Sequence, residues 1–101
     1  TLYVFKYLNP RNGRMVAYLE ATVTDNVIYL DDLFVMSYAR RQHLASRMIE
    51  QAMGLRENQV IRLDCYPDNY PALALYKKFG FEIDGEFEDP AGYTLYHMIK
   101  R

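Results

Sequence analysis

Hydrophobic runs separated by polar turn residues mark the first third of the chain as a series of β-strands. Residues 1–8 and 15–23 are rich in the β-branched and aromatic residues that favour strands. Asn12-Gly13 stands between them and is typical of a hairpin turn. Residues 27–36 predict a third strand that is apolar almost throughout, so we expect burial on both of its faces and a central place in the sheet.

The hydrophobic spacing then changes to a helical period. From about residue 41 to residue 55, apolar side chains recur every three or four positions and form one stripe. The stripe has two adjacent rows, Leu44, Met48 and Ala52 beside Ala45, Ile49 and Met53. Gly54 weakens the end of this helix, and a polar connector follows it.

A further strand at residues 60–66 leads into a second helix. Asp68 or Asn69 is the expected N-cap, and Pro71 is tolerated in the first turn because an N–H there has no helical partner. Gly80 stands where glycine ends a helix. The apolar side of this helix consists of Ala72, Leu75, Tyr76 and Phe79.

Strands at residues 81–88 and 93–100 complete the predicted order, β-β-β-α-β-α-β-β. The strand–helix–strand unit implies a right-handed crossover between parallel strands, whereas hairpins at both ends of the chain give antiparallel pairs. We therefore expect an α/β (α+β) fold, with a mixed, mostly antiparallel sheet and helices packed on its faces. We expect residues 1–101 to form a single domain.

Composition and charge narrow the class of protein. The chain has 101 residues, of which 50% are hydrophobic and 25% charged, enough to bury a core without disulfides. The net charge of -1 gives no reason to expect a nucleic acid or a membrane as partner. The single cysteine, Cys65, indicates a reducing, cytoplasmic setting. Because His43 and His97 are far apart in sequence, we expect no metal site.

Arg40-Arg41-Gln42-His43-Leu44-Ala45 lies where the third strand passes into the first helix. The first N–H groups of a helix have no helical partner, and the helix dipole adds partial positive charge, so an anion fits there. Arg40 and Arg41 add full charges. A solvated arginine pair before a surface helix explains the same residues. Residues 69–81, when taken alone, favour a structural role, with Tyr76 a core aromatic and Asn69 a simple cap, because a helical apolar stripe usually faces a core.

Together the two stretches resemble the GNAT superfamily of acetyltransferases. Residues 40–45 are similar to its Gln/Arg-x-x-Gly-x-Gly/Ala motif, with His43 in the place of a glycine. Asn69-x-x-Ala72-x-x-Leu75-Tyr76-x-Lys78-x-Gly80-Phe81 is similar to its second conserved block. "IYLDDLFVMS" resembles polyamine acetyltransferases, and "ARRQHLA" and "YPALALYKKFG" also resemble aminoglycoside 3-N-acetyltransferases. Because the family normally has a strand and two helices before this part, we expect further sequence upstream of Thr1.

The resemblance implies acetyl-CoA as co-substrate and assigns roles to residues. Backbone amides near the first helix start would hold the pyrophosphate, the third strand would pair with pantetheine and polarise the thioester carbonyl, and Asn69 would position the cofactor arm. Tyr76 would protonate the departing thiolate. The implied cofactor-binding residues are Leu33, Phe34, Val35, Arg40, Arg41, Gln42, His43, Leu44, Ala45 and Asn69. We expect His43 to be tolerated, since a Cβ costs little if the backbone there is helical.

The base that deprotonates the amine is expected among the acidic residues of the second and third strands. Asp31 and Asp32 are consecutive on a strand, so their side chains should point to opposite faces and at most one should face the reacting centre. Asp31 matches the position of a glutamate in the polyamine enzymes and is our choice, directly or through a water, with Asp32 and Glu20 in reserve. A carboxylate held by backbone donors or by an arginine is the structural alternative.

The expected function is N-acetylation of a primary amine by direct attack on acetyl-CoA. The acceptor is a small polyamine- or aminoglycoside-like amine, or a protein lysine or N-terminus, and the enzyme can be a homodimer. The alternative is a non-catalytic acyl-CoA-binding or interaction module. An open cleft at the Tyr76 hydroxyl would favour catalysis, and a packed hydroxyl would favour the module.

Overall fold

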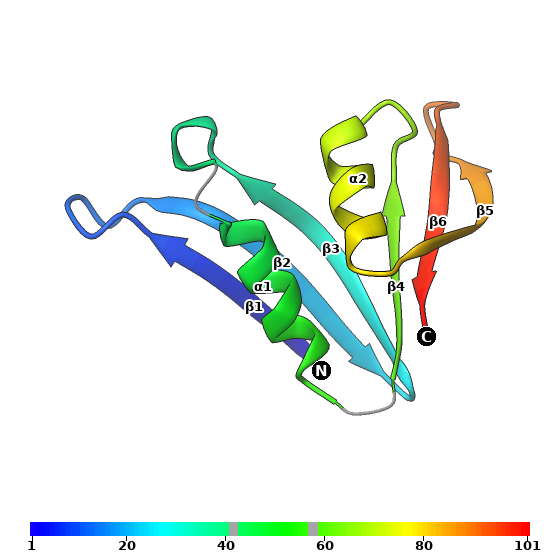
Figure 1. Cartoon of the computed structure of the whole chain (residues 1–101), viewed down its shortest axis with the longest axis horizontal. Helices are drawn as coiled ribbons and strands as arrows, with labels where there is room; N and C mark the ends of the chain where they lie inside the picture. Colours follow the sequence, from blue (N-terminus) through cyan, green and yellow to red (C-terminus); the bar gives the residue numbers. More distant parts are fainter. Residues whose placement is uncertain (41–42, 57–58) are drawn as a thin grey trace.

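The computed structural model describes residues 1–40, 43–56 and 59–101, and its elements follow the predicted order (Figure 1). A short 3-10 turn at Ser37–Ala39 is added between the third strand and the first helix. The elements are β1 (Leu2–Leu8), β2 (Met15–Thr24), β3 (Val27–Val35), α1 (Leu44–Met53), β4 (Val60–Cys65), α2 (Tyr70–Lys78), β5 (Glu82–Glu88) and β6 (Thr94–Lys100). Neither described helix is long and apolar enough to cross a membrane.

The six strands form one sheet in the order β1-β2-β3-β4-β6-β5. Every neighbouring pair is antiparallel except β3 and β4, which confirms the expected mixed sheet. β3 is central, as predicted, but the prediction that both of its faces are buried is wrong. Ile28 and Leu30 are buried while Tyr29 is 47% exposed, because the described helices cover only one face of the sheet.

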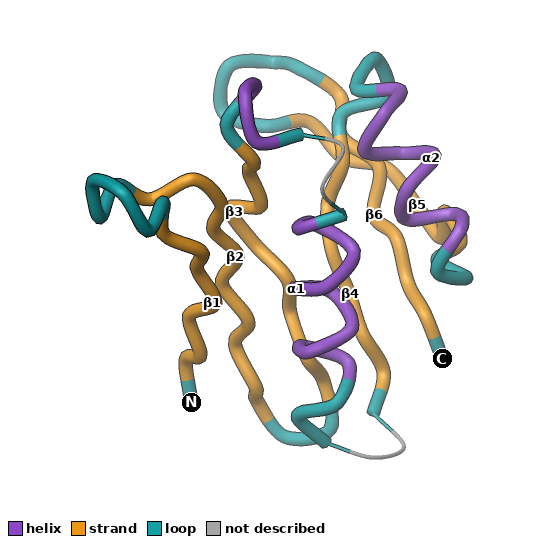
Figure 2. The backbone as a smooth tube through the Cα atoms, turned by 60° about the vertical axis from the view of Figure 1, so that its left-hand side comes forward, coloured by secondary structure: helices purple, strands orange, loops and turns teal. Residues whose placement is uncertain are grey.

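Both helices contribute to a single core on that face. The helical stripe predicted for α1 is confirmed, since Leu44, Met48, Ile49 and Ala52 are buried. The stripe packs on alternate residues of the strands that α1 contacts, β1, β2 and β3. Figure 2 shows α1 running along the strands, with α2 beyond it beside the β4–β6–β5 half.

The end of α2 fixes the orientation of Tyr76. Gly80 has a φ of 94°, and its N–H donates to the carbonyl of Lys77 while the N–H of Phe81 donates to that of Tyr76, each over 3.0 Å. This pattern is the Schellman motif, in which glycine supplies the left-handed residue and a hydrophobic contact closes the turn. The contact is made by the Tyr76 and Phe81 rings, which meet edge to face with centroids 6.0 Å apart. The expected glycine stop is therefore confirmed.

The starts of both helices differ in detail from the prediction. α1 begins at Leu44 rather than near residue 41, and His43 is its N-cap residue. Asn69 is the N-cap residue of α2, with Pro71 in the first turn as expected. The Asn69 side chain makes no capping hydrogen bond to a described residue, and it lines the cavities described below instead.

Candidate active site

The site lies where β3 and β4 separate. Their parallel pairing joins Val27–Tyr29 to Val60–Arg62 and extends no further along the described strands. From Leu30 onward the edge of β3 that faces β4 is without a strand partner in the described part of the chain, while its other edge pairs with β2 as far as Val35. An edge of this kind can pair with an extended ligand through its backbone N–H and C=O groups.

A groove of about 780 Å³ runs from the end of β3 past the start of α1 to α2. This volume lies within the range of small-molecule sites in proteins. Eight of the ten residues predicted to bind the cofactor line this groove: Leu33, Phe34, Val35, Arg40, His43, Leu44, Ala45 and Asn69. The other two, Arg41 and Gln42, lie outside the described residues. The fold therefore brings residues that are 36 positions apart in sequence, Leu33 and Asn69, to one cavity.

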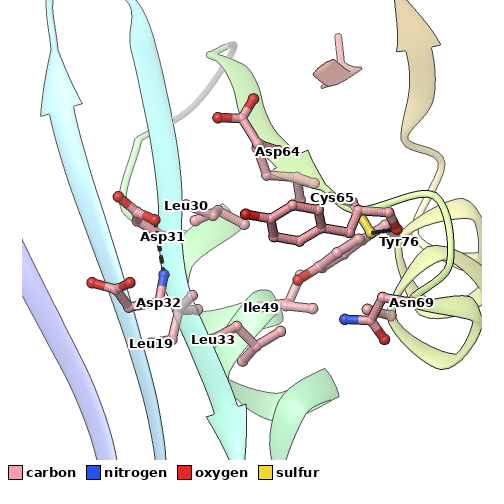
Figure 3. Close-up of a pocket in the computed structure, with 13 residues that line it drawn as sticks. Leu19, Leu30, Asp31, Asp32, Leu33, Ile49, Asp64, Cys65, Asn69 and Tyr76 are labelled. Atoms are coloured by element: carbon pink, nitrogen blue, oxygen red, sulfur yellow. Dashed lines mark hydrogen bonds between the residues drawn. The ribbon is translucent and has the colours of Figure 1, made fainter. Parts of the chain in front are cut away.

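A smaller cavity of about 180 Å³, here called the inner pocket, opens into the gap between β3 and β4. It shares Leu33, Asn69 and Ala72 with the groove, so the two cavities adjoin. Figure 3 shows Asp31 and Asp32 on β3 at one side of this pocket and Tyr76 and Asn69 at the other, with the two carboxylates pointing away from Tyr76 and Asn69. Both residues predicted to be catalytic, Asp31 and Tyr76, thus line the same pocket, next to the groove.

The expectation that Asp31 and Asp32 point to opposite faces is wrong. Leu19 of β2 lies opposite two residues of β3, Asp32 and Leu33, which is a β-bulge, and Asp32 has a φ of 53°. A bulge with a left-handed residue interrupts the alternation of side chains along a strand. Both aspartates therefore line the inner pocket, and their carboxylate oxygens lie within 4.8 Å of each other and of Glu20.

Negative charge is concentrated in this carboxylate cluster, Glu20, Asp31 and Asp32. The charge of Asp31 raises the pKa of Asp32, with smaller contributions from burial and from Glu20. Repulsion of this kind favours a proton or a cation at the cluster, and an ammonium group or a hard metal ion would relieve it. The Asp32 N–H donates to Asp31 Oδ1 over 3.0 Å, so one Asp31 oxygen is held by a backbone donor, as the structural alternative foresaw.

Tyr18 is part of this site and was not singled out from the sequence. Its hydroxyl donates to Glu20 Oε1 over 2.7 Å, and its ring stacks on Phe34 with centroids 5.8 Å apart. The hydrogen bond to Glu20 raises the pKa of Tyr18, so the phenol stays protonated and fixes the carboxylate. Tyr18 and Glu20 are two residues apart on one strand, and this spacing was the available signal for their contact.

Tyr76 is 8% exposed, and its side chain lines the inner pocket. Burial raises the pKa of Tyr76 to about 12, with a smaller contribution from the neighbouring thiol of Cys65. The phenol is therefore a hydrogen-bond donor at neutral pH. A thiol has a pKa of about 8.5, so full proton transfer from Tyr76 to a thiolate is uphill, and its suitable role is hydrogen-bond donation to a sulfur on which charge is building.

The expectation of a helical backbone at His43 is wrong. His43 has φ 58° and ψ 28°, the left-handed region that favours glycine because it lacks a Cβ. A glycine at this position of the related motif would adopt this conformation without strain, whereas His43 adopts it with a Cβ and therefore at a steric cost. The side chain of His43 is exposed at the groove, and α1 starts directly after it.

Asp64 is a further site residue that the sequence analysis missed. It lies on β4 across the gap from Asp31 and lines the inner pocket with it. The signal was topological, since residues toward the carboxyl ends of adjacent parallel strands meet at the same edge of a sheet. A cavity between diverging parallel strands, a groove at a helix start and a carboxylate cluster define a site suited to a cofactor with a long extended arm and a cationic second substrate.

The profile of the Acetyltransferase (GNAT) family matches residues 2–81. The chain therefore belongs to the GNAT acetyltransferase family, which confirms the resemblance found in the two motif stretches. No curated protein matches the chain.

Solved structures of low sequence identity share the fold. An acetyltransferase from Bacillus cereus ATCC 14579 is 23% identical with a TM-score of 0.82, over 100% of this chain and 73% of that one. A protein from Bordetella pertussis assigned to the GnaT family is 17% identical with a TM-score of 0.79, over 99% and 66%. An Arabidopsis thaliana protein in complex with the bisubstrate analogue CoA-Ac-MVNAL is 22% identical with a TM-score of 0.77, over 89% and 68%. The chain thus spans 66 to 73% of the length of these solved chains.

Proposed function

We propose that the chain is an N-acetyltransferase that transfers the acetyl group of acetyl-CoA directly to a primary amine. The observation that carries the proposal is that the groove and the inner pocket adjoin. Together they form one continuous site, which is lined by Leu33–Val35, the start of α1, Asn69 and Tyr76. In that site, the pyrophosphate lies at the start of α1 and pantetheine pairs with the unpartnered edge of β3. The structure with CoA-Ac-MVNAL supports acetyl-CoA as the donor, and the peptide part of that analogue supports an amine acceptor.

The inner pocket then holds the reacting atoms. The carboxylate cluster attracts the ammonium group of the acceptor, and Asp31 begins the removal of its proton, directly or through a water. The amine nitrogen attacks the thioester carbon and the C–S bond breaks, while Tyr76 donates a hydrogen bond to the departing sulfur. The second proton of the nitrogen leaves with this sulfur as the thiol. The acceptor is a small polyamine- or aminoglycoside-like amine, or a protein lysine or N-terminus. The single domain is proposed to act in the cytoplasm, alone or as a homodimer.

The test is an acetyl-CoA titration of the full chain by calorimetry, followed by turnover assays. The amine panel consists of spermidine, kanamycin, a lysine-containing peptide and a peptide with a free N-terminus. We expect saturable acetyl-CoA binding and acetylation of at least one amine. Binding without any turnover would contradict the enzyme and favour an acyl-CoA-binding module, and absence of binding would contradict both.

A further inference from the structure

A third cavity, here called the outer pocket, lies on the side of the sheet away from the helices. It has a volume of about 220 Å³, and its polar lining consists of Tyr29, Asp31, Arg62, Asp64 and His97. Asp31 and Asp64 line the inner pocket as well, together with Leu30 and Leu63. The two pockets therefore share their walls at the gap between β3 and β4, one on each side of the sheet.

His97 and Asp64 form an ordered pair in this outer pocket. They are register partners on β6 and β4, and His97 Nδ1 lies 2.8 Å from Asp64 Oδ1. The Phe87 ring of β5 stacks on the imidazole with centroids 4.5 Å apart. With the Nδ1–H donated to the carboxylate, Nε2 is left as the acceptor nitrogen, which is the arrangement that makes a histidine a base.

The charges around the Asp64–His97 pair favour binding of a cationic group. Arg62, the basic residue beside Asp64 on β4, donates to Asp84 Oδ2 of β5 over 3.2 Å, so its charge is already compensated. The carboxylates of Asp31 on β3 and Asp64 on β4 contribute negative charge to the lining of the outer pocket. Tyr29 of β3 adds a phenol to the same lining. The His97 side chain is 46% exposed, so solvent can exchange protons with the imidazole.

We infer that the Asp64–His97 pair is the group that finally accepts the proton of the acceptor ammonium, with Asp64 holding the imidazole and His97 Nε2 taking the proton. This inference rests on the proposed function. The N–H bond of the ammonium breaks and an Nε2–H bond forms, directly or through Asp31 or one water. The neutral amine attacks the thioester, its second proton leaves with the thiolate as the thiol, and the imidazolium returns its proton to solvent.

The chemistry of the side-chain classes supports imidazole in this role. An ordinary carboxylate has a pKa of about 4, an imidazole about 6.5 and an alkyl ammonium about 10. Proton transfer from the ammonium is therefore less unfavourable to an imidazole than to a carboxylate alone. A base matters most where the amine is protonated, so its contribution must fall as the pH approaches the pKa of the amine.

His97→Asn tests the inference, because the asparagine amide can still donate to Asp64 from the Nδ1 position but takes up no proton. We expect kcat/KM for the best amine of the panel to fall about 100-fold at neutral pH, within the range for general bases. The loss should shrink toward about pH 10, while acetyl-CoA affinity and the melting temperature change little. Added free imidazole should restore part of the rate of His97→Ala.

Glu86→Gln is the matched control, since it removes a charge from β5 at the register position beside that of His97. It should leave the pH profile of kcat/KM unchanged. Equal pH profiles for the parent and His97→Asn, in a chain that acetylates an amine, would overturn the inference and leave the proposed function standing. A pH-independent loss would make His97 a structural residue and overturn it as well. A parent chain without turnover would overturn the proposed function, and the inference with it.

Discussion

The backbone N–H of Phe81 donates to the carbonyl of Tyr76, and the rings of the same two residues meet edge to face. The turn that ends α2 thus also orients the phenol that lines the inner pocket. The left-handed Gly80 between them makes this geometry possible.

Gly80→Ala should therefore weaken the fold. A Cβ at φ 94° is strained, and it would also lie 3.3 Å from Lys100 Nζ. We expect the free energy of unfolding to fall by about 1 to 2 kcal/mol, measured by urea denaturation. Gly85→Ala is the control, because its Cβ would meet no atom within 4 Å and its backbone is not left-handed. Equal losses in both variants would refute the role of the turn.

Tyr76→Phe should lower kcat far more than acetyl-CoA affinity. The hydroxyl acts only as charge builds on sulfur, so we expect a fall of about 10² to 10³-fold in kcat with a nearly constant Kd. Steady-state kinetics and calorimetry provide the two values. Tyr70→Phe is the control on the same helix, since Tyr70 is 72% exposed. An unchanged kcat in Tyr76→Phe would make this residue a packing residue only.

His43→Gly should stabilise the chain. Glycine adopts φ 58° without strain, so we expect the free energy of unfolding to rise by up to about 1 kcal/mol and CoA affinity to stay similar or tighten. His43→Ala removes the imidazole but keeps a Cβ, and it should show neither gain. If both variants lose CoA affinity and this loss occurs only at acidic pH, the imidazole is a charged ligand of the phosphate.

Asp32→Asn should raise the melting temperature at neutral pH. The pKa of Asp32 is raised in the folded chain, chiefly by the charge of Asp31, so the ionised form destabilises the fold. This penalty is absent below the ordinary aspartate pKa of about 4 and grows as the pH rises through the raised value. The gain should therefore be present at neutral pH and vanish in acid.

Asp25→Asn separates this effect from backbone strain. Asp25 also has a φ of 53° but lies outside the carboxylate cluster, and asparagine tolerates that conformation well. Its effect on the melting temperature should not depend on pH in this way. The same gain for Asp32→Asn at acidic and neutral pH would show that only the backbone had responded.

Asp31→Asn should shift the pH dependence of turnover upward, because fewer amines are deprotonated without the carboxylate. The rate loss is expected at neutral pH and should diminish toward the pKa of the amine, about 10. A pH–rate profile of parent and variant with the same amine checks this. Coincident profiles would transfer the role to another member of the cluster or to solvent.

Local patterns in the sequence predicted most of the fold. The periodicity of α1, the glycine that ends α2 and the parallel pair formed across α1 each follow from residues close to one another in the chain. The bulge at Asp32 was missed because the prediction assumed that side chains alternate regularly along the strand. A bulge also depends on the partner strand, which this alternation does not reveal. The left-handed His43 was missed because the glycine of the related motif at this position, which was the available signal, was not interpreted as a requirement for positive φ. The burial of β3 was overestimated because its apolar residues do not reveal which face the helices cover.

The three register pairs between β3 and β4 have a kinetic consequence. They join the β1–β2–β3 half of the sheet to the β4–β6–β5 half at one end only, while the inner pocket lies toward the open end. A donor whose arm occupies this gap would fix the separation of the two halves and with it the distance from Asp31 to Asp64. The acceptor would then find a formed site only after the donor has bound, which favours an ordered sequence with acetyl-CoA first.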